Sequence, residues 1–194
     1  MDRDRRAFLL RIAVALLLAG GYAAIWLSGA APSADEARDW GEDLGWIAAV
    51  RGGAVGAGVN LAFATDLRIV SQEAKIVSGF LPIGLHPGGG HGALLGRTGQ
   101  REAAAAMALF GEGIDGTRAV SLGLAWQAVD DNEVEGVAAA LAARAAKDPE
   151  LARRTARSMR AEWGPPPLPW PAALELERAS QMWSMRRKDL AGGD

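Results

Sequence analysis

The segment RGGAVGAGVNLAFATDLRIV, residues 51–70, most constrains how this chain can fold. Glycines stand at positions 52, 53, 56 and 58, directly after an apolar run and directly before another. Glycine allows backbone turns and close approaches that a Cβ forbids, so such a cluster indicates a tight turn between two elements. The pattern predicts a buried strand at 44–52, a short helix at 57–66, and strands at 67–70 and 74–79.

The rest of the chain predicts mostly helices. Asp115 and Pro149 stand where a side-chain cap and a first-turn proline favour the start of a helix. We expect helices at 100–111, 116–124, 132–148, 149–163 and 172–189, and one more strand at 125–130. The fold class is therefore α/β, divided into an atypical apolar segment 1–30, a core 31–130 and a helical region 131–194.

Composition excludes several classes of function. The 194 residues are 49% hydrophobic and 23% charged, which is typical of a globular protein, and a net charge of −2 argues against nucleic acid as a partner. The chain has no cysteine, so disulfides and thiolate chemistry are excluded. Its two histidines have no carboxylates clustered near them, so we expect no metal site.

The N-terminus leaves three interpretations open. Basic residues in MDRDRR precede an apolar stretch from Ala7 to Leu27, interrupted by Arg11. This order is typical of a signal peptide, and its length also suits a signal anchor. The third interpretation is a buried strand and helix of a globular core.

The glycine-rich turn itself also has competing interpretations. Gly56 and Gly58 could begin a dinucleotide fingerprint, but Leu61 replaces its third glycine. A phosphate loop would need a Lys-Ser/Thr pair, which is absent from the turn. The turn could instead present backbone N–H groups at a helix start to a developing oxyanion. Close packing of a strand on a helix is the structural alternative.

Three blocks resemble consecutive signatures of the crotonase (enoyl-CoA hydratase/isomerase) superfamily. They are WIAAVRGGAVGAGVNLAFATDLRIVSQEAKI, IGLHPGGGHGALLGRTGQREAAAAMALFG and IDGTRAVSLGLAWQAV, within roughly residues 45 to 160. The resemblance implies a ββα spiral core truncated at its N-terminus and a helical tail that forms a homotrimer or a dimer of trimers. It further implies a cytoplasmic protein with an acyl-CoA thioester ligand, coenzyme A being part of the substrate and no other cofactor being needed.

The resemblance also assigns site residues. It makes Ala57 the second backbone donor of the oxyanion hole and places the first near Gly21. Asn60 and Phe80 stand at the positions of the two glutamates with which the family's hydratases move protons. Neither an amide nor a benzyl group transfers protons at neutral pH, and losing such help costs about 10²–10⁴ in rate per group. Efficient hydration is therefore disfavoured.

Several expectations follow from this departure. His86, Gly88, Gly89 and His91 are further candidates for lining the pocket, although either histidine could simply satisfy loop backbone. The family's opening strands have no counterpart, so either the first spiral units are missing or the start of the chain is misread. The alternatives are a non-catalytic acyl-CoA-binding pseudoenzyme and a degraded crotonase module anchored in a membrane through residues 7–27.

Overall fold

The computed structural model describes residues 45–98, 100–164 and 166–191. The strands are β1 (Ile47–Val50), β2 (Gly53–Val55), β3 (Leu67–Ser71), β4 (Lys75–Val77), β5 (Gly113–Ile114) and β6 (Gln127–Val129). The helices are α3 (Ala57–Phe63), the 3₁₀ turn η1 (Leu81–Ile83), α4 (His91–Gly96), α5 (Arg101–Ala108), α6 (Gly116–Ser121), α7 (Val134–Ala145), α8 (Pro149–Trp163) and α9 (Trp170–Ala191). The predicted α/β class is confirmed.

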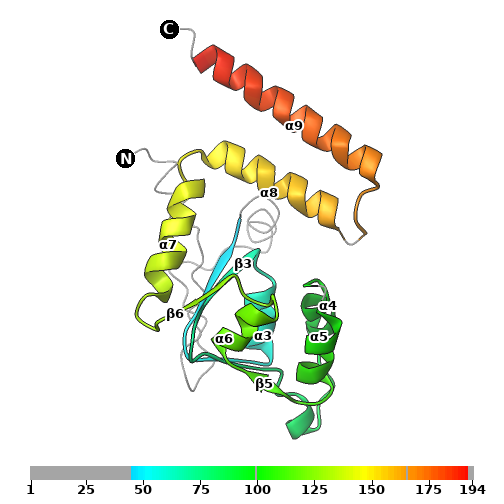
Figure 1. Cartoon of the computed structure of the whole chain (residues 1–194). Helices are drawn as coiled ribbons and strands as arrows, with labels where there is room; N and C mark the ends of the chain where they lie inside the picture. Colours follow the sequence, from blue (N-terminus) through cyan, green and yellow to red (C-terminus); the bar gives the residue numbers. More distant parts are fainter. Residues whose placement is uncertain (1–44, 99, 165, 192–194) are drawn as a thin grey trace, which may run out of the picture. The chain divides into compact units, whose positions relative to one another are not determined.

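The strands form two small sheets. One has the order β1-β3-β6 with parallel pairing throughout. The other has the order β2-β4-β5, in which β2 and β4 are parallel and β5 is antiparallel to β4. The parallel neighbours β1 and β3 need a crossover, and the chain between them runs through β2 of the other sheet and then through α3. In Figure 1, α3 and α6 lie between β3 and β5.

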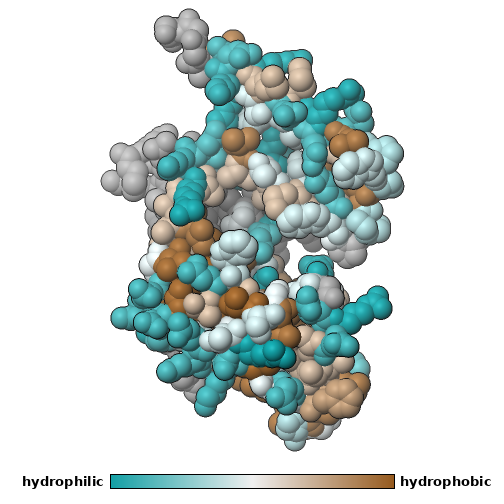
Figure 2. Space-filling view, in the orientation of Figure 1, coloured by the Kyte–Doolittle hydropathy of each residue, from teal (hydrophilic) through white to brown (hydrophobic). Residues whose placement is uncertain are grey.

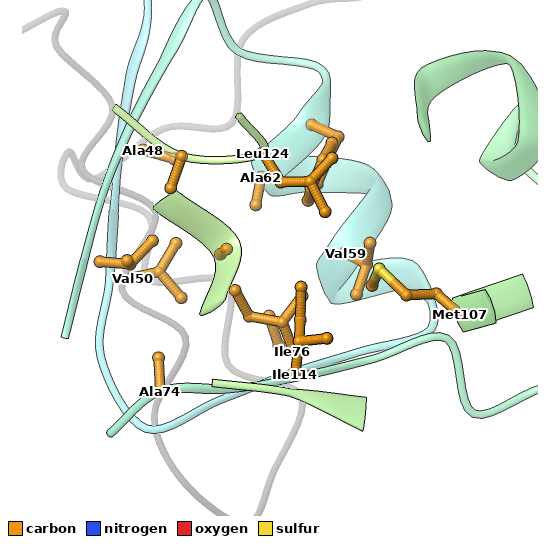
Figure 3. Packing of buried hydrophobic residues seen from close by; sticks show 14 of the residues in the cluster. Ala48, Val50, Val59, Ala62, Ala74, Ile76, Met107, Ile114 and Leu124 are labelled. Carbon is orange, nitrogen blue, oxygen red and sulfur yellow. The ribbon is translucent and has the colours of Figure 1, made fainter. Parts of the chain in front are cut away.

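The main core lies where α3 meets both sheets. Val59 and Ala62 on one face of α3 are buried in the same cluster as Val50 of β1 and Ile76 of β4 (Figure 3). Met107 of α5 closes the cluster beside Val59. Burying a side chain such as Val59 contributes about 1.5–3 kcal/mol. These contacts fix the position of α3, and with it the glycine turn that precedes the helix.

Helix α7 covers a second, smaller cluster on the β1-β3-β6 sheet. Its Val134 and Ala138 pack with Ala49 and Ile69, whose neighbours in the strands belong to the main core. Successive side chains of a strand point to opposite faces, so β1 and β3 are apolar on both. Arg51 Nε lies 2.9 Å from Asp131 Oδ2, just before α7.

Among the described residues, 46–144 form a sheet-bearing unit, and Gly45 groups with residues 145 onward in a helical unit. The division by sequence assigned α7 to the helical region 131–194, whereas its contacts lie with the sheet. In the helical unit, Asp148 Oδ1 accepts a hydrogen bond from the Leu151 N–H at 3.1 Å, and Pro149 occupies the first turn of α8. The predicted start of this helix is thus confirmed.

Hydrophobic side chains also reach the surface of the sheet-bearing unit. Figure 2 shows them interspersed among hydrophilic residues on the visible face. Large exposed ones include Leu61 of α3 and Ile83 of η1. No helix among the described residues is long and apolar enough to cross a membrane. The N-terminal interpretations, including the segment 1–30 and an anchor at 7–27, lie outside the described residues.

Candidate functional site

The glycine turn before α3 has the geometry that only glycine adopts readily. Gly56 has φ 54° and ψ −112°, and its N–H donates to the Val77 carbonyl at 3.0 Å. A Cβ at this position would meet Ser78 O at 3.6 Å and Phe80 Cζ at 3.7 Å, which is ordinary contact, so the backbone conformation and not space requires glycine. Ala57 then begins α3 as an exposed residue, and its N–H donates to no other described residue.

Asn60, one turn into α3, connects that helix to the second glycine-rich segment. Its Nδ2 donates to the Gly88 carbonyl at 2.9 Å, and its Oδ1 lies 2.7 Å from His91 Nδ1. Gly89 has φ 64°, and a Cβ there would stand 2.8 Å from Asn60 Nδ2. The close approach of the loop to the amide therefore depends on glycine at position 89.

His91 is the first residue of α4, and its imidazole is buried with 1% of the residue exposed. Its Nε2 lies 2.7 Å from the hydroxyl oxygen of Ser78, which follows β4 and is also buried. Burial lowers the pKa of His91 below its usual value, because desolvation penalises the imidazolium form. His91 is therefore a neutral imidazole near neutral pH.

Phe80 packs its ring against His91. The two ring centroids lie 5.0 Å apart at an interplanar angle of 69°, an edge-to-face arrangement. The structure thus brings together five of the predicted site residues and places them beside the α3 start that carries Ala57. The five are Asn60, Phe80, Gly88, Gly89 and His91.

Of the other predicted residues, His86 is not hydrogen-bonded to this group, and Gly21, the predicted first oxyanion donor, is not among the described residues. His86 is exposed, and its Nδ1 lies 2.8 Å from the carbonyl oxygen of the next residue, Pro87. Conversely, sequence reasoning missed Ser78. A serine after an apolar strand is unremarkable in sequence, and only the fold brings it to a histidine 13 positions later.

Residues 43–186 match the sequence profile of the enoyl-CoA hydratase/isomerase family. The chain belongs to this family. Probable enoyl-CoA hydratase EchA14 of Mycobacterium tuberculosis is 41% identical over 136 residues, which cover 70% of this chain and 50% of that protein. The 1,2-epoxyphenylacetyl-CoA isomerase of Escherichia coli K12 is 39% identical over 103 residues, 53% of this chain and 39% of that enzyme. The chain spans about half the length of the first of these relatives, and less of the second.

Solved structures agree with this membership. A protein from Thermobifida fusca YX, crystallised in complex with CoA, has a TM-score of 0.67 and 30% identity, covering 78% of this chain and 58% of that one. A structure from the same organism in complex with acetoacetyl-CoA has a TM-score of 0.66 and 28% identity, with 76% and 58% covered. The crotonase-like fold that the sequence blocks implied is confirmed.

Proposed function

We propose that the chain binds an acyl-CoA thioester at the start of α3, where the Ala57 N–H donates to the thioester oxygen. The family supports this proposal, as do the CoA and acetoacetyl-CoA complexes of its structural relatives. Within this chain, the support is that Ala57 is an exposed residue at the helix start and its N–H donates to no other described residue. Such a donor, pre-oriented by the turn at Gly56, is what an enolate or tetrahedral oxyanion requires.

Efficient hydration is not part of the proposal. Addition of water to an enoyl thioester needs a base for the water and an acid for the α-carbon. The observation that carries this point is the amide of Asn60, which is already bonded to Gly88 and His91. At the second position, Phe80 offers only a benzyl ring, which packs on His91. The same observation favours the second candidate, a non-catalytic acyl-CoA-binding protein.

Assembly and location extend the proposal. By analogy with the family, the helical region forms a homotrimer or a dimer of trimers. CoA thioesters are intracellular, so we propose a cytoplasmic protein whose only coenzyme is the CoA of its ligand.

The test is calorimetric titration with crotonyl-CoA, comparing Ala57→Pro with Ala57→Gly. Proline suits the first position of a helix but lacks an N–H, whereas glycine keeps the donor. We expect Ala57→Pro to weaken binding roughly 2- to 10-fold, the value of one net hydrogen bond, and Ala57→Gly to bind like wild type. Absence of crotonyl-CoA binding by the wild type, or equal affinity of both variants, would contradict the proposal.

Turnover separates the two candidates. If the enoyl absorbance is lost at a rate comparable to that of an ordinary hydratase, the proposal that hydration is inefficient is wrong. Acyl-CoA binding without hydration or isomerisation of any enoyl-CoA tested would identify the non-catalytic binding protein.

A further inference from the structure

Three polar side chains, two of them buried, form a hydrogen-bonded array beside the proposed site. Ser78 comes from the end of β4, His91 from the start of α4 and Asn60 from the middle of α3. Ser78 is 2% exposed and His91 is 1% exposed. Buried polar groups are costly unless they are bonded, and here both ring nitrogens, the hydroxyl and both ends of the amide have partners.

The hydrogen-bond partners determine which atom donates and which accepts in each bond of this array. The Gly88 carbonyl can only accept, so the NH₂ end of Asn60 must face it and the Oδ1 end must face His91. Oδ1 can also only accept, so His91 Nδ1 carries the proton. Because the ring is neutral, Nε2 is bare and accepts from the Ser78 hydroxyl. The arrangement is the Nδ1–H tautomer of His91.

This connectivity resembles that of a nucleophilic serine, its histidine base and an orienting amide. The two 2.7 Å distances would suit that chemistry. A nucleophilic role nevertheless fails because a thioester cannot reach the serine: Ser78 is only 2% exposed, and the Phe80 ring lies against His91. A group that cannot reach a thioester carbon cannot attack it. The role of the array must therefore lie in the neighbouring groups that it keeps in place.

The array holds two features that border the start of α3. One is the glycine loop at 88–90, where Gly89 and Gly90 have φ 64° and 77°. Glycine restricts its backbone little, so the loop depends on its hydrogen bonds. The Gly88 carbonyl accepts from Asn60 Nδ2 at 2.9 Å and from the His91 N–H at 3.3 Å, so the Asn60 side chain adds a bond from α3 to the one that α4 supplies. The other is the Phe80 ring, which contacts His91 and stands 3.7 Å from where a Gly56 Cβ would be.

We propose that Asn60, His91 and Ser78 are positioning residues that fix the loop 88–90 and the Phe80 ring beside the thioester site. An amide at position 60 is therefore a requirement of this site. A glutamate there has no N–H for the Gly88 carbonyl, and its charge would draw a second proton to His91. The inference rests on the proposed function, since it assigns these residues a role in acyl-CoA binding.

Ring ¹⁵N NMR of the full chain tests the tautomer directly, because the chain has only two histidines to assign. In the wild type near neutral pH, we expect His91 to be neutral with a protonated Nδ1 and a bare Nε2. An Nε2–H tautomer or an imidazolium at His91 would overturn the array. Neither result depends on whether acyl-CoA binds, so failure of the array and failure of the proposed function are distinguishable.

The isosteric variant Asn60→Asp tests the link to binding. It replaces the donor to Gly88 with an acceptor and places a carboxylate on His91 Nδ1, so His91 should become an imidazolium. We expect crotonyl-CoA affinity to fall roughly fivefold or more, as for loss of a bond of about 1 kcal/mol. The control Gln72→Glu makes the same amide-to-acid change at an exposed residue and should leave affinity unchanged.

A second variant covers the case in which Asn60→Asp does not fold. Ser78→Ala removes only the hydroxyl on Nε2 and should leave His91 in the Nδ1–H form, with a shifted Nε2 resonance as evidence of the lost bond. If the ¹⁵N resonance of His91 Nε2 is the same in Ser78→Ala as in the wild type, the hydrogen bond from Ser78 to His91 is overturned. An altered His91 in Asn60→Asp with unaltered acyl-CoA affinity would overturn the positioning role.

Discussion

A Cβ on Gly116 would lie 1.9 Å from the carbonyl oxygen of Ser71. Gly116 begins α6, and its N–H donates to the Gln72 carbonyl at 3.1 Å, so the helix starts in direct contact with the backbone at the end of β3. The obstacle is backbone, which cannot rotate aside as a side chain can. This contact sets the position of α6 against the parallel sheet.

Gly116→Ala should therefore destabilise the sheet-bearing unit. Forcing a methyl group into filled space typically costs about 1–3 kcal/mol, because backbone must shift. Gly136→Ala is the matched control, since Gly136 lies inside α7 and, apart from the helix's own nearby backbone, no described atom lies within 4 Å of its Cβ position. There alanine should raise the free energy of unfolding by up to about 1 kcal/mol. Urea unfolding measures both, and equal stability of the two variants would contradict the contact.

Asn60→Glu should not create hydration activity, although it places a carboxylate at the position that the proposed function matches to one of the family's glutamates. The new side chain cannot donate to the Gly88 carbonyl, and under the proposed function hydration still lacks a second proton-transfer group because Phe80 is unchanged. We expect no gain in crotonyl-CoA hydration and a loss of stability of about 1–3 kcal/mol from the broken bonds. Leu61→Glu adds the same charge at an exposed neighbour on α3 and serves as control. A hydration rate well above wild type would refute this expectation.

Most of the secondary structure follows from the sequence because its signals are local. The apolar run at 44–52 contains β1, and the run at 67–70 covers β3 except for its last residue, Ser71. Asp115 caps α6 as predicted, its Oδ1 accepting from the Arg118 N–H at 2.6 Å. These features depend on neighbours within a few residues. The two short strands β2 and β5 were not predicted, because three and two residues are too few to produce an alternating pattern.

The site was predictable only in part, for a physical reason. The family resemblance assigned Asn60 and Phe80 to the site, and His91 was a candidate because it flanks the glycine loop, but neither argument says which atoms meet. The bond from Ser78 to His91 depends on β4 and α4 being placed together by the core. So does the bond from Asn60 to Gly88, which joins residues 28 positions apart. The sequence thus identified the neighbourhood, and packing determined the hydrogen bonds.

Stability should depend on pH through His91. The folded pKa of this imidazole lies below its usual 6.5, so as pH falls through about 6.5 the unfolded chain binds a proton that the folded chain does not. The free energy of unfolding should fall, by up to about 1.4 kcal/mol per pH unit, until the folded pKa is reached. The described side chains bonded or packed on His91 are Ser78, Asn60 and Phe80, none of them charged.

Urea midpoints between mildly alkaline and mildly acidic pH measure this effect. His91→Gln should flatten the dependence, whereas His86→Gln, at an exposed loop position, should preserve it. Arg51 lowers the pKa of the Asp131 carboxyl. For Asp148, desolvation raises the pKa, but the Leu151 N–H and Arg187 together outweigh it, so the pKa of this carboxyl is also lowered. Their stabilisation is lost only in more acidic solution. A wild-type midpoint that stays constant through pH 6.5 would contradict the buried neutral histidine.

In the helical unit, Arg187 of α9 holds the start of α8. Its guanidinium pairs with Asp148, its Nη1 lies 3.3 Å from Glu150 Oε2, and Arg154 of α8 stacks on the Trp183 ring of α9 at 4.1 Å. Because the Arg187 side chain is 40% exposed, Arg187→Ala should cost only about 0.5–1 kcal/mol, and the loss should shrink at high salt. Hydrogen exchange of the α9 amides should accelerate accordingly. Arg186→Ala removes an equal charge from an exposed neighbour and should not change exchange, so equal acceleration in both variants would show that net charge, and not this pairing, holds the two helices together.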